Sequence, residues 1–139
     1  MRFIVMVKAT KDSEAGVMPS RELLEEMGKF NEELVKAGVI LAGEGLEASS
    51  KGVRAHYGKQ GVTFTDGPFA ETKELIAGFW LWQVRSKEEA LEWLRRAPMR
   101  VGDEVELRRV FDASDFAPQA TPEMIAKEAE LRKSAEGKK

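Results

Sequence analysis

Three charged residues in the middle of the sequence could perform acid–base chemistry together. Asp66 and Glu44 are a possible pair of carboxylates lining one cleft, and Lys73 follows shortly after Asp66. Two carboxylates held close together split their pKa values, so one can act as a base near neutral pH while the other stays charged. Lys73 could bind an anionic substrate or stabilise developing negative charge. This set predicts proton transfer, or a cofactor-free isomerisation or elimination, on a small anionic compound.

Aromatic and basic residues near this set could form the walls of a ligand pocket. Phe69, Trp80 and Trp82 would supply apolar surface, and Arg54 or Lys73 would supply the charge opposite an anion. The two tryptophans could equally form the core of an interface, because burying a Trp side chain removes a large apolar area from water. No nucleophile and no metal-binding set is visible beside them, so the sequence predicts neither a cofactor nor a metal.

Residues 66–68, Asp-Gly-Pro, are also typical of a turn. Asp accepts hydrogen bonds from its own downstream amides, Gly tolerates positive φ, and Pro fixes the next φ. Phe69 would then fill the core beside the turn. This interpretation leaves residues 71–73, Glu-Thr-Lys, without a role. Glu44 has a similar alternative, because a residue between two glycines in a strand often marks a bulge.

The composition of the 139-residue chain excludes several kinds of site. Without cysteine there are no disulfides, thiolate nucleophiles or Cys-based metal centres, and the single histidine, His56, is expected on the surface of a strand. A net charge of −2, from 22 basic and 24 acidic residues, argues against direct nucleic-acid binding. No apolar run approaches the roughly 18 residues of a membrane span. We therefore expect a soluble cytoplasmic protein.

Short apolar segments alternate with amphipathic segments along the chain, which indicates both strands and helices. Strands are expected at 2–9, 39–46, 53–57, 62–65, 77–84 and 105–110, and helices at 20–37, at 87–96 and from Thr121 onward. Residues 10–19 are expected to form a loop. This order predicts a ferredoxin-like βαββαβ sandwich of the α+β class. Its antiparallel sheet would carry both helices on one face, with an inserted β-hairpin and a C-terminal helix added.

The two main helices are predicted from their caps and apolar stripes. Ser20 can cap the first helix, and Ser86 with Glu89 can form a capping box for the second. The residues expected to face the sheet are Leu23, Met27, Phe30 and Leu34 in the first helix and Ala90, Leu91 and Leu94 in the second.

The strand at 77–84 is apolar on both faces, which predicts self-association. Trp80 and Trp82 share one face of this strand, while Phe79 and Leu81 share the other. If the tryptophans faced water they would leave a large exposed patch. A second copy packing sheet against sheet would cover them, so we expect a homodimer. The alternative is that the terminal helix folds back over the same face.

The segment 66–74, Asp-Gly-Pro-Phe-Ala-Glu-Thr-Lys-Glu, is the most distinctive in the chain. With 78–80, Gly-Phe-Trp, and 43–46, Gly-Glu-Gly-Leu, it resembles the DGPF-motif branch of the YCII-related family, over about residues 1–112. The resemblance implies a dimeric α/β-barrel-like ferredoxin fold. Some relatives resemble small lactone-processing or dehalogenating enzymes, and members of this branch often accompany extracytoplasmic-function sigma factors.

The chain departs from the family at one catalytic position. Better-studied YCII-type proteins carry a histidine early in the first helix, proposed to act with an aspartate, but residues 21–27 contain none. The His–Asp dyad is therefore not transferable to this chain. The same absence argues against a resemblance in activity to heme-degrading members of the wider barrel group, which need an axial histidine.

Two functions of different classes follow from these observations. The first is a small-molecule-binding protein or enzyme with a pocket between the sheet and the first helix. The second is a non-catalytic accessory protein that binds a sigma factor and could use the extension 113–139 as its docking element. In that extension Met124, Ile125 and Leu131 are expected to dock against the partner subunit of the dimer, the alternative being a mobile tail, frayed from about Lys133.

Overall fold

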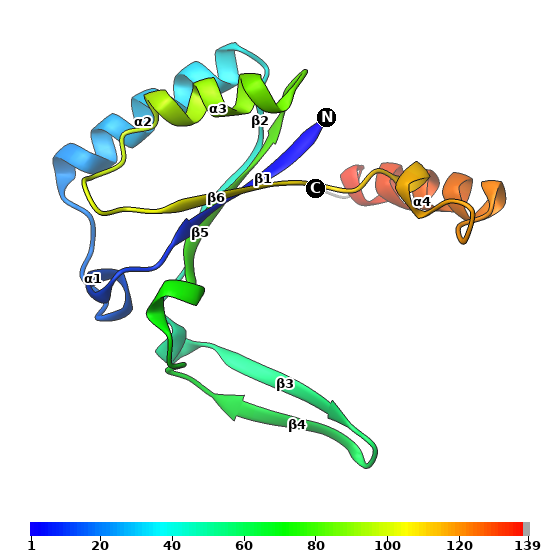
Figure 1. The fold of residues 1–139 in the computed structure, drawn as a ribbon, viewed down its shortest axis with the longest axis horizontal. Helices are drawn as coiled ribbons and strands as arrows, with labels where there is room; N and C mark the ends of the chain where they lie inside the picture. Colours follow the sequence, from blue (N-terminus) through cyan, green and yellow to red (C-terminus); the bar gives the residue numbers. More distant parts are fainter. Residues whose placement is uncertain (138–139) are drawn as a thin grey trace. The chain divides into compact units, whose positions relative to one another are not determined.

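The computed structural model describes residues 1–137, which form two compact units. The first unit comprises Met1–Arg109, and the second begins at Val110. Figure 1 shows the elements of each unit as a ribbon.

A four-stranded antiparallel sheet forms the framework of the first unit. Its strands are β1 (Arg2–Lys8), β2 (Ile40–Gly45), β5 (Ile76–Gln83) and β6 (Val105–Arg109), in the order β2-β5-β1-β6. Two helices, α2 (Arg21–Lys36) and α3 (Lys87–Arg96), pack on one face of this sheet (Figure 1). The predicted ferredoxin-like α+β architecture is confirmed.

Capping residues set the first turns of both helices. Ser20 Oγ accepts a hydrogen bond from Leu23 N at 3.1 Å, and Ser86 Oγ accepts one from Glu89 N at 3.2 Å. The predicted capping box at α3 is only half formed, because the Glu89 carboxylate accepts from Arg85 N at 2.7 Å. The Glu89 carboxylate therefore bonds to the amide of the residue that precedes the N-cap, and not to the amide of the N-cap Ser86 itself.

The buried face of α3 differs from the predicted one. Ala90 is buried as expected, but Trp93 is the second buried residue, and Leu91 and Leu94 are half-buried. Trp93 lies one turn after Ala90, and its ring meets that of Phe30 edge-on at 6.1 Å. The large apolar area of the indole favours this rotation of the helix over one that buries the two leucines.

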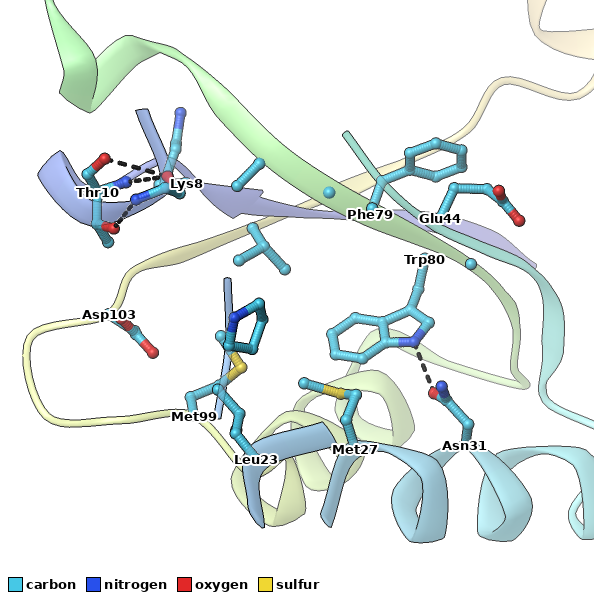
Figure 2. A pocket seen from close by; sticks show the side chains of 17 residues that line it. Lys8, Thr10, Leu23, Met27, Asn31, Glu44, Phe79, Trp80, Met99 and Asp103 are labelled. Atoms are coloured by element: carbon cyan, nitrogen blue, oxygen red, sulfur yellow. Dashed lines mark hydrogen bonds between the residues drawn. The ribbon is translucent and has the colours of Figure 1, made fainter. Parts of the chain in front are cut away.

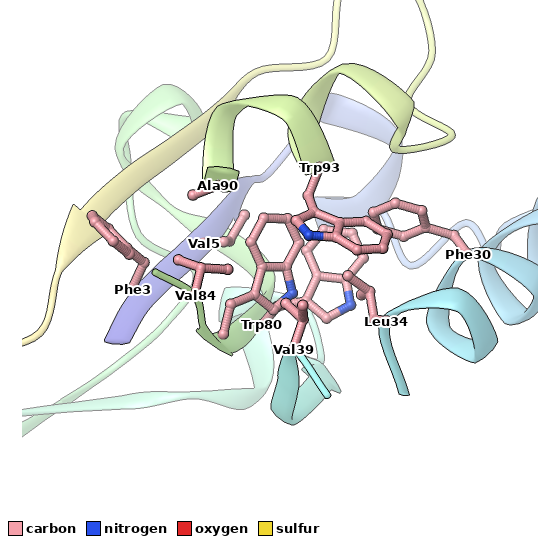
Figure 3. Packing of buried hydrophobic residues seen from close by; sticks show 10 residues of the cluster. Phe3, Val5, Phe30, Leu34, Val39, Trp80, Val84, Ala90 and Trp93 are labelled. Atoms are coloured by element: carbon pink, nitrogen blue, oxygen red, sulfur yellow. The ribbon is translucent and has the colours of Figure 1, made fainter. Parts of the chain in front are cut away.

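The core of the first unit lies between the sheet and the two helices (Figure 3). Its buried members are Phe3, Val5, Phe30, Leu34, Val39, Trp80, Trp82, Val84, Ala90 and Trp93. Ring centroids of Trp80 and Trp82 lie 5.6 Å apart, and Phe30 lies 5.6 Å from Trp80. The two tryptophans thus face the helices, and the prediction that they are open to water in a single subunit is wrong. The alternation of side chains along β5 could not predict which face of the strand meets the helices, because both faces are apolar.

The opposite face of the sheet carries Ile4 and Met6 from β1 and Phe79 and Leu81 from β5, all half-buried. In the register of the sheet Ile4 pairs with Leu81 and Met6 pairs with Phe79, so the four side chains form one apolar patch. We call these four residues the outer patch.

A second, two-stranded sheet is formed by β3 (Val53–Gly58) and β4 (Gly61–Asp66), which confirms the predicted hairpin. All of its residues are exposed. Short 3₁₀ turns precede and follow it, η1 at Ser49–Lys51 and η2 at Thr72–Glu74.

The segment predicted as a loop at 10–19 contains a one-turn helix, α1 (Lys11–Glu14). Thr10 and Ser13 form a capping box, in which Ser13 N donates to Thr10 Oγ1 at 3.1 Å and Thr10 N donates to Ser13 Oγ at 2.8 Å. These reciprocal bonds satisfy the free amides of so short a helix.

The second unit consists of η3 (Ala113–Phe116) and α4 (Pro122–Glu136). Thr121 Oγ1 accepts from Met124 N at 3.2 Å, and Pro122 occupies the first turn as expected. The helix continues to Glu136, beyond the expected fraying point at Lys133, and the last two residues of the chain lie outside the described part. None of the residues in α4 is buried, so docking of Met124, Ile125 and Leu131 stays a prediction. No helix among residues 1–137 combines the length and hydropathy needed to cross a membrane.

Candidate functional site

A cavity of about 370 Å³ lies between α2 and the sheet, in the space where the sequence predicts a ligand pocket (Figure 2). Leu23 and Met27 of α2, Trp80 of β5 and Met99 from the connection to β6 supply apolar wall. Such a size and lining are typical of small-molecule pockets in proteins.

Glycines bring the backbone of β2 and β5 close to this cavity. A Cβ atom at Gly43 would lie 2.9 Å from Trp80 Cδ1, and one at Gly78 would lie 2.9 Å from the Glu44 carbonyl oxygen. These separations are shorter than any real Cβ contact, so only glycine permits the close approach at these two positions. The bulge in β2 lies between Ile40 and Ala42 rather than at Glu44.

One polar side chain interrupts the apolar stripe of α2 where it meets the cavity. Asn31 lies one turn beyond Met27, and its Oδ1 accepts a hydrogen bond from Trp80 Nε1 at 2.9 Å. Asn31 was not among the residues predicted to form the site. A signal was available, because Asn31 occupies the i+4 position from Met27 on the predicted sheet-facing stripe.

The Glu44 side chain points away from the cavity, although the residue contributes to its lining. Glu44 pairs with Phe79, whereas Gly43 pairs with Trp80, so Glu44 lies on the opposite face of the sheet from Trp80. Figure 2 shows the Glu44 and Phe79 side chains directed away from α2.

Asp66 and Lys73 lie outside this cavity. Asp66 is the last residue of β4 and Lys73 lies in η2, and both are exposed. The first unit therefore does not bring the side chains of Asp66, Glu44 and Lys73 into the α2–sheet cavity.

Residues 66–69 form a turn that packs on η1. Gly67 N donates to Gly52 O at 3.0 Å, and Phe69 N donates to Ser49 Oγ at 3.0 Å. A Cβ atom at Gly67 would lie only 1.8 Å from Ser49 O, so only glycine fits there. The Gly67–Pro68 peptide bond is cis. The motif thus has a structural role that the turn interpretation did not include, namely docking one end of the hairpin.

Arg54 and Phe69, two of the predicted ligand contacts, meet each other beside this turn. The Arg54 guanidinium carbon lies 3.9 Å from the centroid of the Phe69 ring, a cation–π geometry. Neither residue lines the α2–sheet cavity.

The predicted tryptophan walls divide between core and cavity. Trp80 lines the cavity with part of its surface, although it is only 5% exposed. Trp82 is completely buried, and its Nε1 has no hydrogen-bond partner among the described residues. Trp82 therefore offers no surface to a ligand in this conformation.

A second cavity, of about 750 Å³, adjoins the first where both are lined by Ser13, Pro19, Gly45 and Ala77. Its wall includes Glu14 at the end of α1 and the residues just before and within η1. Glu14 Oε2 accepts from Ser49 N at 2.8 Å, and Glu14 Oε1 accepts from the Ser49 hydroxyl. Because Ser49 Oγ also accepts from Phe69 N, one carboxylate anchors both η1 and the turn at 66–69.

The hydrogen bonds from the Ser49 hydroxyl and from the Ser49 backbone amide lower the pKa of Glu14, against a smaller opposing effect of burial. A carboxyl group with a lowered pKa in the folded state stabilises that state above its ordinary pKa. The stabilisation is lost as the pH falls through the lowered value.

We therefore expect amide exchange at Ser49 and Phe69 to accelerate when the pH falls below the usual range for a glutamate, after correction for the intrinsic pH dependence. NMR-detected exchange between pH 3 and 7 would measure this effect. In a Glu14→Gln variant the extra acceleration should be absent. Identical corrected profiles in the variant and the wild type would contradict the assignment.

The single histidine, His56, lies in β3 and pairs with Thr63, with an exposed side chain. Among residues 1–137 no three His, Asp or Glu side chains gather closely enough to hold a metal ion.

Residues 1–114 match the family model of the YCII-related domain. No protein with a curated functional description matches the chain. Among solved structures, the fold is similar to that of 5-chloro-2-hydroxyhydroquinone dehydrochlorinase (TftG) from Burkholderia phenoliruptrix AC1100, determined in complex with 2,5-dihydroxybenzoquinone. The two chains share 15% identity with a TM-score of 0.39, over 76% of this chain and 91% of the other. At this level of identity the likeness concerns the fold alone.

Proposed function

The chain belongs to the YCII-related family, and we propose that it binds a small, largely apolar compound in the cavity between α2 and the sheet. The observation that carries this proposal is the apolar lining of a cavity large enough for a ring compound, with Asn31 as a polar contact. Apolar cavities of this kind bind small aromatic molecules because binding transfers the apolar surface of the ligand from water to a preformed apolar wall.

Binding is the function that this geometry supports best. The catalytic roles of Asp66 and Glu44 on an anionic compound stay predictions, because the Glu44 carboxylate points away from the cavity and Asp66 lies outside it. The accessory role beside a sigma factor also stays a prediction from the family resemblance. We assign the chain to the DGPF branch on the sequence of residues 66–74.

The binding proposal is tested by filling the cavity. Met27→Trp would place an indole in the space beside Trp80, and we expect it to abolish binding of naphthalene measured by isothermal titration calorimetry. Val35→Trp is the matched control, because Val35 lies on the same helix, is 63% exposed and lines neither cavity. If naphthalene binds Met27→Trp as tightly as it binds the wild type, the α2–sheet cavity is not its binding site.

We also propose that a second copy of the chain covers the outer patch. The four apolar side chains of the outer patch are only half-buried in a single subunit, and packing the same face of a second copy against them would remove them from water. Sedimentation at micromolar concentration should show a dimer. A 15.5 kDa species would overturn this proposal.

A further inference from the structure

We infer that Asn31 makes the α2–sheet cavity selective for ring compounds that carry a neutral carbonyl oxygen. This inference rests on the proposed binding function and deepens it. It depends on the hydrogen bond between Asn31 and Trp80 and on the position of Asn31 in the cavity wall.

The bond to Trp80 determines which end of the Asn31 amide remains free. An indole N–H can only donate, so the group that faces Trp80 Nε1 at 2.9 Å must be the amide oxygen. The Asn31 Nδ2 group therefore keeps both of its N–H donors, and no hydrogen bond from it is formed within residues 1–137. The cavity wall thus holds a donor whose orientation is chemically determined.

The orientation is also mechanically restrained, because Trp80 cannot turn freely. Its ring packs against Phe30 and Trp82, each with centroids 5.6 Å away, and its Cδ1 edge lies so close to Gly43 that a Cβ atom there would come within 2.9 Å. A donor that is already oriented loses little conformational freedom when a ligand binds. Asn31 is half-buried, and its amide N–H groups have no protein partner in the described part of the chain with which a ligand acceptor would have to compete.

Of the other polar side chains in the wall, Glu44 points away from the cavity and the rest have protein partners. Thr10 and Ser13 bond to each other in the cap of α1, and Asp103 Oδ2 accepts from Arg100 N at 2.8 Å. Lys8 also contributes to the lining, but its ammonium group lies 3.2 Å from the Glu106 carboxylate. Because this cation is already paired, a neutral acceptor suits the cavity better than a carboxylate. The anionic ligand expected from Lys73 and Arg54 stays a prediction, because neither residue lines this cavity.

The apolar lining favours a planar ring for the rest of the ligand. Met27 and Met99 contribute flexible thioethers to the same cavity wall as the Trp80 indole, and such side chains adapt to the edges and faces of aromatic rings. A bicyclic lactone such as coumarin combines this shape with one carbonyl acceptor. Naphthalene has nearly the same shape and no acceptor, so the two compounds form a matched pair of probes.

The test compares both probes on the wild type and on Asn31→Asp. The aspartate keeps an oxygen for Trp80 Nε1 and replaces the free N–H donors by a second oxygen. We expect coumarin to bind about tenfold more weakly or worse to this variant, because a carbonyl facing a carboxylate loses its hydrogen bond and meets repulsion. Naphthalene affinity should stay within about twofold, because an apolar ring makes no hydrogen bond to the amide.

Gln83→Glu is the control for the change from amide to acid. Gln83 lies at the end of β5, is exposed and lines neither cavity, so this variant should bind both probes as the wild type does. A second measurement needs no variant at position 31. In ¹H–¹⁵N spectra of the wild type, coumarin should shift the Asn31 side-chain amide resonances more than naphthalene does.

The outcomes separate this inference from the proposal on which it rests. Loss of coumarin binding alone in Asn31→Asp, together with the selective amide shift, supports the inference. Equal weakening of both probes, or no weakening of either, overturns the role of Asn31 while leaving the cavity a binding site. If neither probe binds the wild type, the proposed function itself fails.

Discussion

Trp82→Ala should lower the free energy of unfolding by about 4 kcal/mol, the range observed when a large aromatic side chain is deleted from a core. Trp82 is completely buried, and its ring packs against Trp80 and Phe30 between the sheet and α2. The loss arises from the removed apolar contacts and from the cavity that remains. Denaturant unfolding followed by circular dichroism at two protein concentrations would measure it.

The control for this prediction is Phe79→Ala, on the other face of the same strand. Phe79 is half-buried in the single chain, so its loss should cost at most about 1–2 kcal/mol of intrinsic stability, on the scale of buried area. The effect of Trp82→Ala should not depend on protein concentration, because its contacts lie within one subunit. If Trp82→Ala instead has a small effect on the free energy of unfolding that depends on protein concentration, the tryptophans lie at an interface between subunits.

Gly67→Ala should undock the turn at residues 66–69 from η1. A Cβ atom at this position would lie 1.8 Å from Ser49 O, a backbone atom that cannot rotate away. Overpacking of this severity costs about 3 kcal/mol. At about 1.4 kcal/mol per tenfold change, amide protection at Gly67 and Phe69 should fall by roughly a hundredfold, whether or not the rest of the fold is affected.

Gly58→Ala provides the comparison, because it makes the same substitution at the other end of the hairpin. There the nearest atom to an added Cβ is Gly61 O at 3.7 Å, an ordinary contact. We expect protection at Gly67 and Phe69 to stay as in the wild type. If Gly67→Ala leaves this protection intact, the motif does not require the close packing on Ser49.

The local sequence was sufficient to predict the elements of the first unit. Ser20 and the stripe from Leu23 to Leu34 predicted α2, and the turn signal at 58–61 predicted the β3–β4 hairpin. These features depend on neighbours one helical turn or one strand position away, so a single sequence contains them. The short helix α1 was missed because its cap, Thr10 with Ser13, uses residue types that are equally common in loops.

The residues of the motif at 66–69 were recognised, but not what they contact. Turn chemistry predicted the bend at Gly67 and Pro68. The partners Ser49, Gly52 and Glu14 lie far away in the chain, and no periodic pattern relates them to the motif. For the same reason, the charges of Asp66, Glu44 and Lys73 gave no information on whether their side chains share a cavity.

By itself, then, the sequence determined the order of strands and helices, the class of fold and the family, because local propensity and pattern are properties of neighbouring residues. Only the tertiary structure decided which face of β5 is covered, since both faces are apolar and the choice follows from packing Trp80 and Trp82 against Phe30. Asn31 and Trp80 lie 49 positions apart in the sequence, and only the packing of α2 on the sheet brings them into contact. Distances through space between side chains are set by packing, and this is why the candidate site emerged from the fold.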